Sequence, residues 1–219
     1  ELFELAYAIQ VRRAGLRPFP ILPLNAFGFL AASLIQWHAS SPDTVYLLFV
    51  LAAAAYSSSS LLRATLLPAW EGTELDSIKR GGFQGPLALA AGLAAVAISL
   101  KLTGLQVSLV LLAEAELLYL AGLHFRQSFV RHLASAILGG AAVRMLMVDV
   151  PRADRIDLFH TMWHRWSPVA MLYAAVFYSN RRLAVPGVFH GHAGAAMLML
   201  VLGAEIRPVY LGLTWLLLA

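Results

Sequence analysis

Apolar runs, each closed off by charged residues or proline, recur along the whole chain and constrain its fold more than any other feature. With 60% hydrophobic and 13% charged residues, the chain is more apolar than soluble domains, which are roughly 45–50% apolar and about 25% charged. A bilayer can cover such surface, but it leaves no partner for exposed backbone groups, so the runs have to form helices or a closed barrel. The alternating pattern of barrel strands is absent from the sequence. We therefore predict an all-α fold, a polytopic transmembrane helical bundle.

The apolar runs predict seven to eight helices within the 219 residues. The last run is shorter than the roughly 20 residues that a membrane span requires, and residues 1–11 look like the end of another helix. We therefore expect a single multi-pass membrane region over residues 1–219, cut from a longer chain. A partial similarity between the stretches that begin at Leu102 and Pro208 indicates repeated helix pairs. The predicted helices cover residues 21–38, 44–65, 86–101, 104–123, 129–148, 165–180, 188–204 and 208–219.

Alternate loops differ in charge, which predicts the topology. Residues 67–84 form a short cytoplasmic loop in this interpretation, with a surface helix at 73–80 that ends at Gly81, and residues 149–164 form an extracytoplasmic loop. The basic residues are scattered between apolar runs, so we expect no nucleic-acid partner. We expect a multi-pass protein of the bacterial inner (cytoplasmic) membrane. The Lys- and Arg-rich set assigned to the cytoplasmic side comprises Arg12, Arg13, Arg17, Arg63, Lys79, Arg80, Arg126, Arg131, Arg181 and Arg182.

Glu114 and Glu116 lie near the middle of a predicted span and are the most informative polar residues. A carboxylate inside the membrane is costly unless it is protonated or paired. Two residues apart on a helix, these side chains point in different directions, so they do not form a catalytic carboxylate pair. Arg144 on the next helix could reach toward Glu114. The three residues are candidates either for a proton or cation relay or for a structural ion pair.

The extracytoplasmic loop supplies a second set of candidates. Its alternating charges favour either a surface that binds a headgroup, a glycan or a partner, or a solvated connection between helices. His160 and His164 would share one face if the segment were helical, but the surrounding residues do not complete a zinc-protease motif. Because the chain also has no cysteine, we predict no metal and no cofactor. The candidates in this loop are Asp149, Arg152, Asp154, Arg155, Asp157, His160 and His164.

The region that contains these residues also resembles a known family. A helix at 105–126 has a central glutamate and a basic turn, and a second helix at 129–149 ends in the sequence MLMVD. Arg155-Ile156 and a further helix follow. This order is similar to a large bacterial family of many-helix predicted membrane proteins, a domain of unknown function.

The resemblance covers residues 25–219 and implies architecture only, because the family has no established activity. The stretches 24–27 and 213–215 are similar to its repeated units. One departure lies at 108–111, where the family pattern has a tryptophan before the glutamate.

Three functions remain open from the sequence. The first is a non-enzymatic scaffold or accessory subunit of a membrane or envelope assembly, because no complete catalytic constellation is present. The second is transport of a proton, an ion or a lipid-linked substrate through Glu114 and Glu116. The third is an enzyme that acts on lipid or glycan at the outer loop. The expected partners are membrane lipids and other membrane protein subunits.

Overall fold

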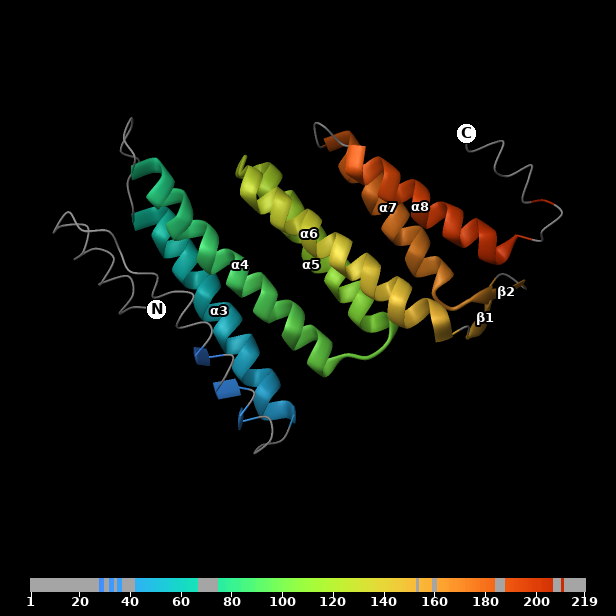
Figure 1. Ribbon diagram of the computed structural model, residues 1–219, viewed down its shortest axis with the longest axis horizontal. Coiled ribbons are helices and arrows are strands. Elements are labelled where there is room, and N and C mark those ends of the chain that lie inside the picture. The colour runs from blue at the N-terminus through green and yellow to red at the C-terminus, as the bar shows by residue number, and fades with distance from the viewer. Residues whose placement is uncertain are drawn as a thin grey trace. The chain divides into compact units, whose positions relative to one another are not determined.

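The computed structural model describes residues 28–29, 32–33, 35–36, 42–66, 75–152, 154–158, 161–183, 188–206 and 210. These residues contain six helices and one two-stranded hairpin. The chain divides into two compact units, residues 1–103 and 104–219. Figure 1 shows the helices of each unit arranged as antiparallel pairs.

The N-terminal unit contains the helix pair α3 (Pro42–Leu66) and α4 (Leu75–Lys101). Its core lines one face of each helix: Val45, Phe49 and Tyr56 on α3 pack against Ala90, Leu93 and Ala97 on α4. These spacings of three, four and seven residues are those of a single helix stripe. At one end of the pair, Lys101 Nζ lies 2.6 Å from Asp43 Oδ1.

The C-terminal unit contains two helix pairs joined by a hairpin. α5 (Leu105–His124) pairs with α6 (Ser128–Arg144), and α7 (Ser167–Leu183) pairs with α8 (Val188–Glu205). α6 continues into a π-helical turn, η1 (Met145–Asp149), and a 3₁₀ turn, η2 (Val150–Arg152). The antiparallel strands β1 (Arg155–Leu158) and β2 (Thr161–His164) connect this segment to α7.

The turn between α5 and α6 depends on two unusual backbone positions. The Gln127 and Arg126 amides donate to the carbonyls of Gly122 and Leu123, which is the Schellman pattern that ends many helices. Arg126 has φ +54°, a left-handed conformation that costs a non-glycine residue roughly 1 kcal/mol. A Cβ on Gly122 would lie 2.9 Å from the backbone nitrogen of Arg131, so the two helices can approach this closely only at glycine.

Most helices predicted from the apolar runs are confirmed. Those expected at 44–65, 104–123, 129–148, 165–180 and 188–204 are present within a few residues of their predicted ends. Among the described residues, five segments are long and apolar enough to cross a membrane: Asp43–Leu62, Gln84–Lys101, Leu105–His124, Ser128–Arg152 and Val188–Glu205.

Two local predictions differ from the structure. The helix stop predicted at Gly81 is wrong, because α4 runs without interruption from Leu75 to Lys101. Residues 75–84 of the predicted cytoplasmic loop are therefore helical, and residues 67–74 lie outside the described residues. A glycine weakens a helix but ends it only where it adopts a left-handed conformation. The predicted outer loop at 149–164 begins at the last residue of η1 and contains the turn η2 and the β1–β2 hairpin. The predicted helices at 21–38 and 208–219 lie largely outside the described residues.

Candidate functional site: two buried polar networks

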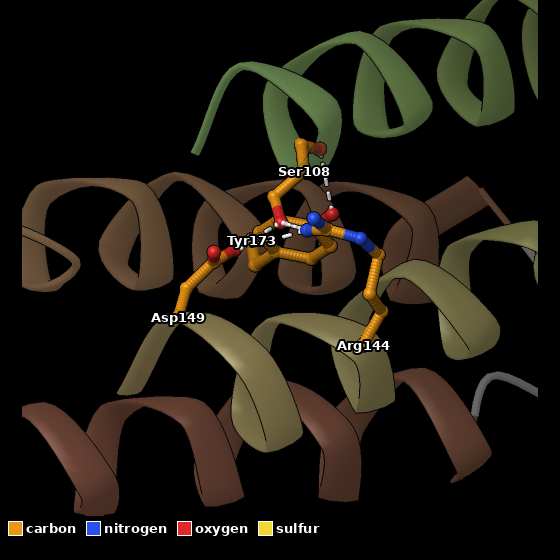
Figure 2. A network of polar contacts seen from close by, with 4 residues as sticks. All are labelled: Ser108, Arg144, Asp149 and Tyr173. Carbon is orange, nitrogen blue, oxygen red and sulfur yellow. Dashed lines mark hydrogen bonds and ion pairs between the residues drawn. The ribbon is translucent and has the colours of Figure 1, made fainter. Parts of the chain in front are cut away.

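The first polar network, called here the Arg144 network, joins Ser108, Arg144, Asp149 and Tyr173. Arg144 Nη1 lies 3.1 Å from Asp149 Oδ2 and donates to Ser108 Oγ at 2.8 Å. Ser108 Oγ in turn donates to the same carboxylate oxygen at 2.7 Å. Figure 2 shows the guanidinium and the carboxylate meeting at the serine hydroxyl, with the tyrosine behind them. The network therefore ties α5, α7 and the end of α6 together.

The π-helical turn explains why Arg144 and Asp149 can pair. Residues five apart on an α-helix point ~140° away from each other. In η1 the Val150 amide donates to the Met145 carbonyl, five residues earlier, and this wider turn brings residues five apart onto one side. The polar pair is thus a product of the irregular helix geometry.

Burial makes the Arg144 network energetically important. The side chains of Arg144 and Asp149 are 24% and 2% exposed, and Ser108 and Tyr173 are fully buried. Tyr173 donates its hydroxyl hydrogen to the Ser108 carbonyl at 2.7 Å. Asp149 Oδ1 has no hydrogen-bond partner in the described part of the chain. The carboxylate is nevertheless compensated, because a buried charge needs an opposite charge and a donor, and Asp149 has both.

The second polar network, called here the Glu116 network, joins Glu116, Tyr119, Ser135, Asn180 and His190. Asn180 Nδ2 donates to Glu116 Oε2 at 2.9 Å, and the Tyr119 hydroxyl donates to the Asn180 carbonyl at 3.3 Å. Ser135 Oγ lies 3.2 Å from His190 Nε2. The Tyr119 and His190 rings meet edge to face, with centroids 5.7 Å apart. The network thus takes residues from α5, α6, α7 and α8.

The Glu116 network differs from the first in having no ion pair among the described residues. No lysine or arginine of the described residues lies within ion-pair distance of the Glu116 carboxyl group, whose hydrogen-bond partner is an amide. Asn180 is fully buried, and its Oδ1 has no partner among the same residues. Inside a membrane, a carboxyl group in such surroundings holds a proton or a cation.

Glu114 is separate from both networks. Its Oε2 is buried, and the described residues offer it no hydrogen-bond partner. Arg144, which the sequence suggested as its partner, binds Ser108 and Asp149 instead.

The candidates from the outer loop do not converge on one site. Asp149 is buried in the Arg144 network, whereas Asp154, Arg155 and Asp157 are exposed on or beside β1. Arg152 lies over Gly104, where a Cβ would be 3.2 Å from its Nη1. His160 lies outside the described residues, so its pairing with His164 stays a prediction.

The partner of His164 in the structure is Glu205. His164 lies on strand β2, and its Nδ1 is 2.9 Å from Glu205 Oε1 at the end of α8. The same oxygen accepts hydrogen bonds from the His164 amide and from Ser167 Oγ. This cluster fixes the hairpin to α8. Within the described ranges, no group of three or more His, Cys, Asp or Glu residues is arranged to hold a metal ion.

The sequence analysis missed several residues of the two networks. Each is a polar side chain within an apolar run, and their spacing carries a weak signal: Tyr173 and Asn180 are seven residues apart on α7, so they lie on one face. The missed residues are Ser108, Tyr119, Ser135, Tyr173, Asn180 and His190.

The five long apolar helices and the charged residues within them are compatible with one class of protein, the integral membrane proteins. Comparisons with protein families, with characterised proteins and with solved structures found no match to this chain.

Proposed function

We propose that the chain is part of a membrane transporter and that its C-terminal unit moves protons through the Glu116 network. The observation that carries this proposal is a half-buried carboxyl group in a predicted span, bonded to a neutral amide. Ionisable side chains within membrane helices are rare and commonly functional, and proton relay is one of their common functions.

The neighbours of Glu116 are suited to handing a proton on. His190, the third residue of α8, has its imidazole beside Tyr119 and Ser135, and an imidazole can take up a proton on one nitrogen and release it from the other. The described contacts include no hydrogen bond between His190 and Glu116, so transfer of a proton between them requires a water molecule or a side-chain movement.

No polar contact connects the Glu116 network to the Arg144 network among the described residues. Ser108 lies eight residues earlier on α5, about 12 Å along the helix axis. The buried residues between them on this helix, Leu111, Leu112 and Ala115, are apolar. A relay through this unit therefore requires a rearrangement or transient water between the two networks, as alternating access does in general.

Proton flux into liposomes tests the proposal. The purified chain, reconstituted into vesicles that contain a pH-sensitive dye, is given a pH gradient while valinomycin and potassium hold the membrane potential at zero. We expect flux above that of empty vesicles, and we expect Glu116→Gln to abolish it because an amide cannot take up and release the proton. Asp157→Asn makes the same chemical exchange on an exposed strand and should leave the flux unchanged. Equal flux in the Glu116→Gln variant and the unaltered chain would overturn the relay.

A second candidate, the scaffold or accessory subunit, is favoured by the Arg144 network. The charges of this network neutralise each other within the unit, and its hydrogen bonds connect α5, α7 and the end of α6, as expected of a network that stabilises the fold. If vesicles with the chain show no flux above empty ones, this function takes precedence. Isolation of the chain from membranes with a lipid-preserving polymer should then recover it in a complex with other membrane subunits.

We further propose a finer organisation. The charge pattern of the loops favours seven or eight helices inserted in the bacterial inner membrane, the partial similarity of the stretches at Leu102 and Pro208 favours repeated helix pairs, and the resemblance over residues 25–219 favours membership of the bacterial domain-of-unknown-function family. Because the chain contains no cysteine, single cysteines report its topology directly. A membrane-impermeant thiol reagent applied to sealed cells should label Asp157→Cys and should not label Arg182→Cys. Labelling of both positions in intact cells would contradict this topology.

A further inference from the structure

The basic end of the C-terminal unit, defined here by Arg126, Arg131, Arg181 and Arg182, differs in charge from the opposite end. No Asp or Glu occurs in the sequence between Glu116 and Asp149 or between Asp157 and Glu205. The opposite end instead mixes Arg152, Arg155 and Arg165 with carboxylates. The four arginines of the basic end thus lie ten or more residues from any Asp or Glu in the sequence.

Side-chain contacts show that the four helices meet at this basic end. Glu116 and Tyr119 of α5 bond Asn180, the residue before Arg181 on α7. Ser135, one turn after Arg131 on α6, contacts His190 of α8. The arginines therefore belong to one surface, although they are up to 56 residues apart in sequence.

Two of these arginines are held in defined positions. A Cβ on Gly191 would lie 3.1 Å from Arg181 Cδ and 3.2 Å from its Nε, so the side chain rests along the first turn of α8 where glycine leaves room. Arg126 occupies the left-handed position of the α5–α6 turn, where glycine would be the easier choice. A residue kept in such a conformation indicates a functional use of its side chain.

Large apolar side chains are exposed beside these arginines. Phe125 is 69% exposed, Phe189 is 56% exposed, and Leu183, the last residue of α7, is 48% exposed. Arginines bind phosphate through paired N–H groups, and neighbouring aromatic and aliphatic side chains suit acyl chains. A soluble phosphate compound would use only the first of these features.

We propose that the basic end binds an anionic glycerophospholipid, with its phosphate against Arg126, Arg181 and Arg182 and its acyl chains along Phe125 and Phe189. Basic clusters at the ends of membrane helices attract anionic headgroups, each arginine strengthening the attraction roughly fivefold. The proposal does not depend on whether the unit moves protons.

Native mass spectrometry of the detergent-purified chain, titrated with phosphatidylglycerol or phosphatidylcholine, tests this binding. We expect tighter binding of phosphatidylglycerol. The triple variant Arg126→Gly, Arg181→Gln, Arg182→Gln should reduce its affinity on the order of a hundredfold, to the level of phosphatidylcholine. Glycine at position 126 suits the left-handed backbone. Glycerol phosphate, which carries the headgroup chemistry without acyl chains, should not displace the lipid.

The matched control removes the same number of positive charges at the opposite end: Arg152→Gln, Arg155→Gln, Arg165→Gln. It should bind phosphatidylglycerol as the unaltered chain does. An equal loss in both triple variants, no loss in either, or displacement by glycerol phosphate would overturn the proposal. If the first triple variant does not fold, Arg182→Gln alone can be tested, because Arg182 is exposed in the last turn of α7. This substitution should weaken lipid binding roughly fivefold. Unchanged binding by this variant would overturn the proposal.

Discussion

The two polar networks of the C-terminal unit bury the same kind of group in opposite ways. Asp149 faces a guanidinium and a serine hydroxyl, whereas Glu116 faces an amide. A carboxylate with a counter-charge keeps its charge in an apolar environment, and a carboxyl group without one tends to become neutral. The comparison separates a carboxylate held in an ion pair at one level of the bundle from a carboxyl group held by an amide at another.

The networks also depend on different backbones. Arg144 and Asp149 meet only because α6 ends in a π-helical turn, whereas Glu116 and Asn180 lie on regular helices. π-helical turns are costly and tend to persist where they serve a purpose. In this unit the purpose supported by the geometry is the alignment of a buried ion pair.

The largest effect is expected from Arg144→Gln. This substitution leaves Asp149 buried without a counter-charge, so the free energy of unfolding should fall by about 3–5 kcal/mol. Reversible unfolding in mixed detergent and dodecyl sulfate micelles measures this change.

The double variant Arg144→Gln, Asp149→Asn provides the control for that measurement. It removes both charges and should recover a large part of the loss, because no unpaired charge remains. If the double variant is as unstable as the two single losses added together, the pair does not act as a unit and the contrast between the networks disappears.

Asn180→Leu should have a smaller effect than Arg144→Gln. Leucine is close in size to asparagine, and the substitution removes the donor to Glu116 together with a carbonyl oxygen that has no partner in the described residues. The expected loss is about 1–3 kcal/mol, the usual cost of one unsatisfied buried polar group. The same unfolding assay checks it. A loss as large as that of Arg144→Gln would mean that Glu116 is charged and depends on this amide.

Much of this fold could be predicted from the sequence, because span length and apolar content are properties of single segments. The predicted helix at 129–148, for example, matches α6 and its π-helical continuation closely. The pairing of Arg144 with Asp149 could not be predicted in the same way. Regular α-helical spacing places the two side chains on different faces, and the alternating charges that begin at Asp149 assigned it to the outer loop.

The Glu116 network illustrates a second limit. Glu116 was predicted as a candidate because a glutamate within an apolar run is conspicuous. Its partner Asn180 lies 64 residues away, on a helix whose placement beside α5 is a property of the whole unit. The hairpin β1–β2 escaped prediction for a related reason, since strands of four residues leave too short a pattern to recognise.

The tyrosines give a finer comparison between the networks. Tyr173→Phe removes a buried hydrogen bond of 2.7 Å, whereas Tyr119→Phe removes a longer one of 3.3 Å. We expect the first to lower the free energy of unfolding by about 1 kcal/mol and the second by less. Both variants keep the aromatic ring, so the difference between their unfolding free energies reports the lost hydrogen bonds and not a change in ring packing. The reverse order would indicate that the Glu116 network contributes more to stability than the Arg144 network.

The smallest effect on stability is expected from Glu116→Gln. The glutamine amide oxygen can still accept the hydrogen bond from Asn180, so the change in the free energy of unfolding should stay within roughly 0.5 kcal/mol. Asp149→Asn makes the same exchange in the Arg144 network but leaves an arginine without its counter-charge, so it should cost several-fold more. Equal losses in the two variants would mean that Glu116 is held as an anion. The proton-relay proposal would then lose the observation that carries it, even if vesicles containing the chain conducted protons.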